Sequence, residues 1–339
     1  MTDATLQIDH AGPLVSLQDA GRTGGLRFGV SPSGAMDRAA AAAANAAIGN
    51  PAGSTVIEVS LGGIALTTDT PLTLAMTGGA FGVDVSGTKW AMPCVLTLEP
   101  GQSLTLRGGA EGSWAYLAMA GTIVAPSWMG STARHSKSGL GSPALTTGST
   151  LRIEAPEVRP TRLGNLPRSP NDTGPLRVVM GPQDQYFTRD AVESFLTKPF
   201  RLSPASDRMG LRLEGPPLPL TGALSIPSEP ILRGSVQVSG DGVPTVLMAD
   251  HQSTGGYPKI ATVISVDTDR LAQMRAGQTI AFAAVTPHDA LSITRQRANQ
   301  IAAYLADLEQ PRGTLAERLM RENLIHAEPF DTLTSNAGD

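Results

Sequence analysis

The sequence predicts a mainly β protein with a few helices, organised as two related barrel- or sandwich-like halves and a helical C-terminal tail. Many short apolar segments separated by glycine and proline turns favour an all-β barrel or sandwich over βαβ units. A weak internal repeat, in which EPGQSLTL at 99–106 resembles RAGQTIAF at 275–282, indicates a duplication. We therefore expect a first half over 1–155, a linker over 156–174, a second half over 175–286 and a tail over 287–339.

The first half is expected to consist of short strands and one alanine-rich helix buried against a sheet or barrel. The helix spans 37–48, where helix propensity is high, and stops at the Gly-Asn-Pro of 49–51. A Ser/Gly-rich segment over 126–150 is expected to be a long loop, and such loops are often functional. The expected strands are 4–8, 13–17, 55–59, 64–66, 72–76, 82–85, 95–98, 103–106 and 114–118.

The second half is expected to repeat this plan. An amphipathic helix over 186–196 follows the first strand and ends at a Lys-Pro pair. The chain then closes with two helices, over 286–308 and 311–325. The expected strands are 176–180, 210–214, 224–226, 235–238, 245–248 and 260–264.

Composition excludes several classes of function. The 339 residues carry a net charge of -4, which argues against nucleic acid as the main partner. The single cysteine, Cys94, cannot form an intrachain disulfide and lies in an apolar segment, so we expect a buried thiol. Neither a signal peptide nor an apolar run of membrane-spanning length is found, so we expect a cytoplasmic protein without a membrane segment. The five histidines lack metal-ligand spacing and there is no P-loop, so no metal or nucleotide motif is predicted.

The segment 250–264 concentrates many side-chain chemistries around a Gly-Gly turn. Apolar strand-like residues flank it on both sides, and a polar loop held by strands is a common way to build a site. An ordinary polar hairpin is the alternative, but a plain turn does not need so many different chemistries. Its polar residues are Asp250, His251, Gln252, Ser253, Thr254, Tyr257 and Lys259.

Three further polar clusters are candidates. Arg22 with 31–37 offers a guanidinium, hydroxyls and helix-entry amides suited to a carboxylate, although a capped helix and a locally paired arginine explain the pattern equally well. The charge-dense segment 204–215 is better explained as a solvated, ion-paired turn. Glu229 and Arg233 stand at a strand start, where a buried pair that only supports the loop is the alternative.

Together these segments resemble the biotin-dependent carboxyltransferase-like family, which includes the C-type subunit of 5-oxoprolinase, the KipA proteins, the so-called allophanate hydrolase subunit 2 and the carboxyltransferase domain of urea carboxylase. The resemblance covers residues 5–285 in order and implies two cyclophilin-like β-barrel halves. Ser253 stands where the family usually has threonine, and 128–134 lacks the usual glycine-rich ending. The matching segments are 18–24, 32–37, 45–50, Glu58, 181–183, 206–215, 228–229, 234–238 and 250–264.

The resemblance implies the C-type subunit of an ATP-dependent 5-oxoprolinase, which helps to open the 5-oxoproline lactam to glutamate. ATP would then be bound mainly by a partner subunit, and the partners would be a small KipI-like, B-type subunit and a larger A-type subunit. One alternative is the carboxyltransferase subunit of a biotin-dependent urea or amide carboxylase, with biotin on a separate carrier. The other is a KipA-like regulator that binds a kinase inhibitor and is no enzyme.

Chemistry at an amide carbonyl needs hydrogen-bond donors on the oxygen and an acceptor near the nitrogen. For the matched segments we expect Arg22, Lys259 and Tyr257 to donate, Asp250 or Glu229 to accept, and Asn45 and Gln252 to orient the substrate. Segments 22–37 and 250–264 should line one cleft. The predicted catalytic residues are Asp250, Lys259, Arg22 and Glu229, and the predicted substrate-binding residues are Ser33, Gly34, Asp37, Asn45, Glu58, Gln237, His251, Gln252, Thr254 and Tyr257.

Overall fold

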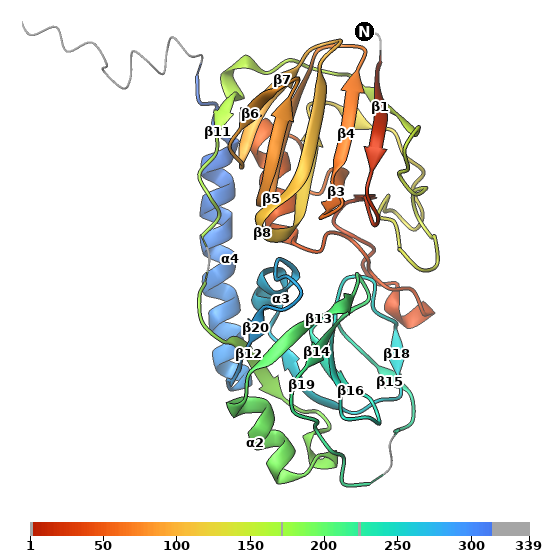
Figure 1. Ribbon diagram of the computed structural model, residues 1–339, viewed down its shortest axis with the longest axis vertical. Coiled ribbons are helices and arrows are strands. Elements are labelled where there is room, and N and C mark those ends of the chain that lie inside the picture. Colours follow the sequence, from red (N-terminus) through yellow and green to blue (C-terminus); the bar gives the residue numbers. More distant parts are fainter. Residues whose placement is uncertain (1–2, 171, 223–224, 314–339) are drawn as a thin grey trace, which may run out of the picture.

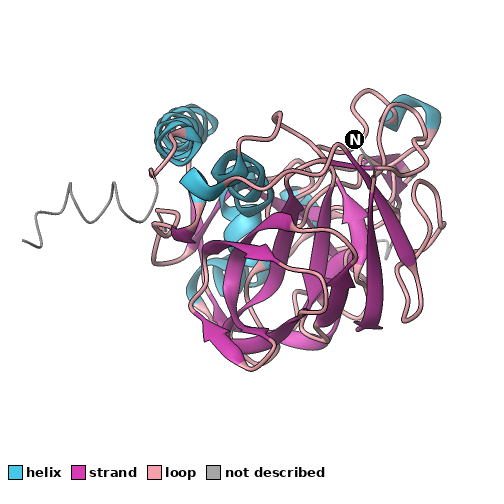
Figure 2. Cartoon of the chain, turned by 90° about the horizontal axis from the view of Figure 1, so that it is seen from above, coloured by secondary structure: helices cyan, strands magenta, loops and turns pink. Residues whose placement is uncertain are grey.

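The computed structural model describes residues 3–170, 172–222 and 225–313, and its two large β-sheets are stacked along the long axis of the molecule (Figure 1). Seen from above, the strands curve around the interior and the longer helices gather on one side of them (Figure 2). The mainly β class predicted from the sequence is confirmed. Among the described residues, no helix combines the length and apolar character needed to cross a membrane.

The described part of the first half forms an 11-stranded sheet in the order β11-β7-β5-β8-β4-β1-β10-β9, with β2, β3 and β6 attached at its sides. Alternate residues along these strands point into an apolar core, as in β4, where every second residue is buried. The strands are β1 (Ala4–Ala11), β2 (Ser16–Gln18), β3 (Val56–Ser60), β4 (Ile64–Thr68), β5 (Leu72–Val85), β6 (Thr88–Trp90), β7 (Cys94–Leu98), β8 (Ser103–Met119), β9 (Thr122–Ile123), β10 (Thr150–Glu154) and β11 (Gly164–Asn165).

Two long strands replace four predicted short ones. Segments 72–76 and 82–85 belong to the single strand β5, and 103–106 and 114–118 to β8. The glycines between them do not turn the chain, because the pairing of β5 with β8 continues through irregularities at residues 78–82. A Cβ on Gly109 would lie 1.8 Å from the carbonyl oxygen of Ala80. Glycine therefore serves here for the close approach of two bulged strands.

The described second half forms an eight-stranded sheet in the order β20-β13-β14-β17-β16-β19-β12-β21 and a two-stranded ribbon. Strand β13 was not predicted, because Pro204 within it suggests a break; the proline lies where the pairing with β14 shifts register. The predicted strand 224–226 lies partly outside the described residues. The strands are β12 (Leu176–Met180), β13 (Phe200–Ser206), β14 (Gly210–Glu214), β16 (Ser235–Val238), β17 (Pro244–Leu247), β19 (Lys259–Val263), β20 (Thr279–Ile280) and β21 (Phe282–Ala284), and the ribbon is β15 (Glu229–Pro230) with β18 (Thr254–Gly255).

The helices join the two halves. The alanine-rich α1 (Arg38–Ile48) is capped by the Asp37 side chain, which accepts from the amide of Ala40. Its buried face belongs to one continuous apolar core with the second sheet, and α4 (Pro287–Glu309) runs along both halves (Figure 1). Helix α3 (Ser265–Ala272) was not predicted, and α2 (Arg189–Thr197) begins after the 3-10 turn η3 (Asp184–Tyr186). The predicted helix 311–325 lies mostly outside the described residues.

The predicted linker segment 156–174 is attached to the first sheet. It contains the 3-10 turn η2 (Pro160–Arg162) and strand β11. Strand β11 pairs with β7, with Gly164 opposite Val95 and Asn165 opposite Cys94. The segment thereby extends the first sheet before the chain enters the second.

Candidate functional site

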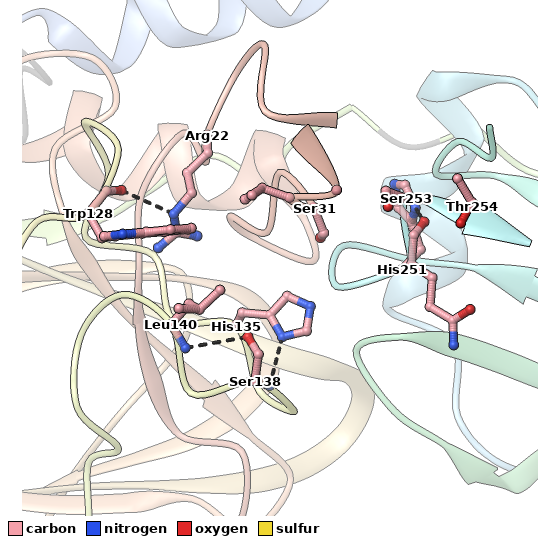
Figure 3. Close-up of a pocket in the computed structure, with 12 residues that line it drawn as sticks. Arg22, Ser31, Trp128, His135, Ser138, Leu140, His251, Ser253 and Thr254 are labelled. Carbon is pink, nitrogen blue, oxygen red and sulfur yellow. Dashed lines mark hydrogen bonds between the residues drawn. The ribbon is translucent and has the colours of Figure 1, made fainter. Parts of the chain in front are cut away.

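A pocket of about 400 Å³ lies between the two halves, and we call it the interface pocket. Figure 3 shows Arg22 and Trp128 on one wall and His251, Ser253 and Thr254 on the other. The two segments expected to share a cleft therefore meet here, through 22–31 of the first half and 251–254 of the second. The lining residues are Arg22, Gly29, Val30, Ser31, Trp128, His135, Ser138, Leu140, His251, Gln252, Ser253 and Thr254.

Arg22 is the fixed positive charge of the interface pocket. Its guanidinium carbon lies 5.3 Å from the centre of the Trp128 ring, Nε donates to the Trp128 carbonyl at 3.1 Å, and Nη2 donates to the carbonyl of Ala133. Burial lowers the pKa of Arg22, while nearby Asp19 and Asp250 raise it. No ion pair involving Arg22 is found among the described residues, so its charge remains available to an anion.

Asp19 holds the wall that carries Trp128. Its Oδ1 accepts from the Gly21 amide at 2.8 Å and the Ser131 hydroxyl at 2.6 Å, and its Oδ2 accepts from the Thr132 amide at 2.7 Å. These contacts tie the turn before Arg22 to the long loop over 126–150. The loop predicted to be functional is thus part of the pocket, positioned by a carboxylate far from it in sequence.

The two histidines present opposite hydrogen-bonding groups. His251 Nδ1 lies 2.6 Å from the carbonyl of Gln252, so in the neutral ring Nδ1 carries the proton and Nε2 is an acceptor. Burial lowers the pKa of His251, which favours that neutral form. His135 Nδ1 accepts from the Ser138 amide at 3.1 Å (Figure 3). Its Nε2 is therefore a donor, so the two imidazoles offer one donor and one acceptor beside the Arg22 cation.

Asp250 lies behind this wall in a buried network with Arg208. Arg208 Nε and Nη2 donate to the two oxygens of Asp250, each at 3.0 Å, and Nη1 donates to Glu58. The amide of Ser136 also donates to Asp250 at 2.8 Å. Burial alone would raise the pKa of Asp250, but the Arg208 charge and these hydrogen bonds hold it below its ordinary value. Both oxygens are engaged, so Asp250 braces the pocket wall in this conformation.

The other predicted residues of the first half make structural contacts away from the interface pocket. Asp37 caps α1 and accepts from Gln273 at 2.9 Å; burial and the charge of Asp269 raise its pKa to about 6. Asn45 donates to the carbonyl of Ser54 at 2.9 Å. Two more join the halves or the helix entry: the carbonyl of Gly34 accepts from Arg208, and Glu58 accepts from the amide of Met36. Ser33 has a φ of 54° and a buried hydroxyl without a partner among the described residues.

A second predicted group surrounds the ribbon β15–β18. Lys259 Nζ lies 3.3 Å from Glu229, which also accepts from Gln183. Gln237 donates to the carbonyl of Tyr257 at 3.5 Å. These residues do not line the interface pocket, although β15 pairs directly with Thr254, which does.

The structure also replaces the pairing considered for Arg233. Arg233 pairs with Asp269 at 3.2 Å and donates to the carbonyls of Ala35 and Met36, whereas Glu229 pairs with Lys259. A buried Glu229–Arg233 pair is therefore wrong. The opposite charge that Arg233 meets comes from α3, a helix the sequence did not predict.

Sequence reasoning missed three residues that shape the site. Trp128 and His135 belong to the long loop, where only its length signalled a function, and Arg208 was placed in a solvated turn although it is 1% exposed. An arginine between a Ser-Asp pair and a Met-Gly pair carries no local sign of burial. Among the described residues, no group of three or more histidine, cysteine or acidic side chains could hold a metal ion.

Comparison with known proteins identifies the family. Residues 28–284 match the model of the carboxyltransferase domain, subdomains A and B. The chain belongs to this family. It is 35% identical to the C-type subunit of 5-oxoprolinase from Escherichia coli over 301 residues, covering 84% of this chain and 93% of that protein. It is 26% identical to urea amidolyase of Lachancea kluyveri, covering 83% of this chain but only 17% of that protein.

A solved structure supports the fold. The crystal structure of Kluyveromyces lactis urea amidolyase superposes on 88% of this chain with a TM-score of 0.79 and 24% identity, and the match covers 20% of that protein. The chain thus spans about a fifth or less of these urea amidolyases and nearly the whole of the E. coli 5-oxoprolinase subunit.

Proposed function

We propose that this chain is the C-type subunit of an ATP-dependent 5-oxoprolinase and that the interface pocket binds the 5-oxoproline lactam. The observation that carries the proposal is the charge of the pocket: within the part of the chain that the structure describes, a buried guanidinium without an ion pair lines it, and no carboxylate does. 5-Oxoproline is a cyclic amide with a carboxylate, so it matches a site with one cation and neutral hydrogen-bonding groups. The likeness to a 5-oxoprolinase subunit over nearly its whole length supports the same choice.

In this proposal the carboxylate of 5-oxoproline pairs with Arg22. Nε2 of His135 donates to the lactam oxygen, and Nε2 of His251 accepts from the lactam N–H. Asp250 acts through the wall, because it holds the Ser136 amide next to His135. Lys259 and Glu229 are proposed to act at the ribbon beside Thr254, where a partner subunit or a closing movement would bring them to the substrate.

The ATP of the reaction is proposed to lie on partner subunits, one small and KipI-like (B-type) and one larger (A-type). The chain contains no P-loop. The interface pocket is also poorly matched to a nucleoside triphosphate, because its lining offers one fixed cation for a group with several negative charges. In this proposal a partner subunit would supply phosphate to the substrate at the surface where that subunit contacts this chain.

The second candidate is a carboxyltransferase subunit that uses biotin on a separate carrier, and the similarity to urea amidolyases favours it. The pocket residues fit the group: the ureido ring of biotin would find the imidazole donor and acceptor, and the carboxylate of its carboxylated form would meet Arg22. Biotin would supply the carboxyl group for transfer, and the chain would orient it. A non-catalytic KipA-like role needs no substrate in the pocket.

The test is steady-state kinetics of the assembled complex with Arg22→Gln. Loss of a charge-assisted hydrogen bond predicts that KM for 5-oxoproline rises at least about tenfold. Arg27→Gln is the matched control, since Arg27 lies in the same loop, over the ring of Phe28, and does not line the interface pocket. An unchanged KM in the Arg22 variant contradicts the pocket assignment. For the wild-type complex, turnover of urea that requires a biotin carrier selects the second candidate. The absence of any turnover selects the non-catalytic, KipA-like regulatory role.

A further inference from the structure

A second pocket, of about 560 Å³, lies mainly on the first half beside the interface pocket and takes Arg208 from the second half. It is formed between the turn that follows β1 and the long loop, which runs beside β1 in Figure 1. Nothing in the proposed 5-oxoproline chemistry uses it. Its lining residues are Ala11, Gly12, Pro13, Leu14, Val15, Ser16, Arg134, Ser136, Ala144, Leu145, Thr146, Thr147 and Arg208.

The two pockets share one wall, the segment 134–138. Arg134 and Ser136 line the second pocket, whereas His135 and Ser138 line the interface pocket. Residues 136–138 form a turn in which the Gly139 amide donates to the carbonyl of His135 at 3.0 Å, so neighbouring side chains of this short segment line different pockets. The second pocket is therefore a separate cavity behind a wall one chain thick.

The charged groups of the second pocket favour an anion. Two guanidinium groups line it, and none of its lining residues in the described ranges is a carboxylate. Arg208 is already neutralised, since it pairs with Glu58 and Asp250. Arg134 donates Nη1 to the carbonyl of Ser142 at 2.9 Å, and no ion pair involving it is found among the described residues. One guanidinium charge is thus left for a ligand.

Hydroxyl and apolar groups complete the lining. Ser136 Oγ is buried and has no hydrogen-bond partner within the described part of the chain, so this donor is not committed there. Ser16 and Thr146 add hydroxyls to the lining. Pro13, Val15 and Leu145 supply apolar surface next to these polar groups, so the pocket combines one cation, several hydroxyls and an apolar patch.

We propose that the second pocket binds a small monocarboxylate with a short apolar arm. The carboxylate would take two hydrogen bonds from the planar fork of Arg134 and one from the hydroxyl of Ser136. The apolar arm would lie against Pro13, Val15 and Leu145. The site is distinct from the interface pocket, and its occupation does not depend on which amide the chain processes.

The experiment uses isobutyrate as the probe and the full chain as the receptor, with binding followed by the NMR line width of the isobutyrate methyl groups. We expect saturable binding to the wild-type chain. Arg134→Gln should weaken it at least about tenfold, and Ser136→Ala should weaken it by a smaller factor. Arg22→Gln is the control: because Arg22 belongs to the interface pocket, the isobutyrate binding that Arg134→Gln weakens should persist in it.

Each outcome decides the proposal. Absence of binding at tens of millimolar isobutyrate overturns it, as does unchanged binding to Arg134→Gln. Loss of isobutyrate binding in Arg22→Gln would show that the probe binds in the interface pocket, and this result would also overturn the second site. If inorganic phosphate displaces isobutyrate and binds more tightly than isobutyrate does, the carboxylate assignment is overturned. Melting curves of both variants establish that they are folded, and Ser136→Ala remains informative if the Arg134 variant is not.

Discussion

Replacement of Arg208 by methionine should strongly destabilise the protein. Arg208 is 1% exposed and makes hydrogen bonds with Asp250, Glu58 and the carbonyl of Gly34, so both carboxylates depend on it. Methionine keeps the apolar stem but leaves two buried carboxylates without their cation. Breaking a buried ion pair in this way costs about 3–5 kcal/mol.

This free energy translates into a measurable thermal shift. With an unfolding entropy of about 2.1 cal/mol/K per residue over 339 residues, about 4 kcal/mol corresponds to a fall in Tm of about 6 °C. The assay is denaturant unfolding at pH 7 together with thermal melting. Arg212→Met is the matched control: Arg212 pairs with Asp241 at 3.1 Å, the two side chains are 45% and 55% exposed, and the expected change is below about 1 kcal/mol.

The pH dependence of the Arg208 variant tests the physical reason. In the wild type the pKa of Asp250 is held below its ordinary value, so its stabilisation is present near neutral pH and is lost only as pH falls through the lowered pKa. Without Arg208, burial raises that pKa, and acid protonates the carboxylate and relieves the cost. The deficit of the variant should shrink between pH 7 and pH 5. A deficit below about 1 kcal/mol at pH 7, or one that does not shrink, would refute the reasoning.

Three further outcomes are expected. The pKa of Asp37 is raised to about 6, so its stabilisation is present in acid and is lost as pH rises through that value. By denaturant unfolding, the stability of the wild type relative to Asp37→Asn should fall by roughly 1 kcal/mol from pH 5 to pH 7, and a rise would contradict the assignment. Gly109→Ala should destabilise the protein by about 1–3 kcal/mol, because the new Cβ would collide with a carbonyl oxygen of β5. Gly222→Ala is the control: a Cβ there has no described atom within 4 Å, so stability should change by less than about 0.5 kcal/mol. Burial raises the pKa of the Cys94 thiol to about 12, so a thiol reagent at pH 8 should modify it only after unfolding; rapid labelling of the folded chain would show that it is accessible.

Local features of the fold were predictable from the sequence. Helix α1 was expected from its alanines, and the Asp37 side chain caps it. Most strands were expected from their alternation, because burial of every second residue leaves a pattern within five residues. Strands β5 and β8 were divided wrongly, since glycine has the same local signature in a turn as in a bulge that allows two strands to approach.

The candidate site shows the same division between local and long-range information. The polar residues of 250–264 marked the second-half wall of the interface pocket, and Arg22 marked the first, because several polar groups around glycines are visible within one segment. The partners of these residues were not visible. Glu58 lies 150 residues from Arg208 and Asp250 lies 42 residues from it, yet the three form one buried network. His135 and Trp128 reach the interface pocket through contacts of their loop with Asp19.

The sequence by itself thus determined the mainly β class, the alanine-rich helix and the two polar segments that supply walls of the interface pocket. These depend on propensity, periodicity and local chemistry, which neighbouring residues encode. Only the tertiary structure decided which carboxylates are neutralised, which of the predicted residues line a pocket, and which guanidinium groups in the described ranges remain without an ion pair. Charge compensation is a property of groups brought together by folding, and it left Arg22 and Arg134 available to ligands while it committed Arg208 to the joint between the halves.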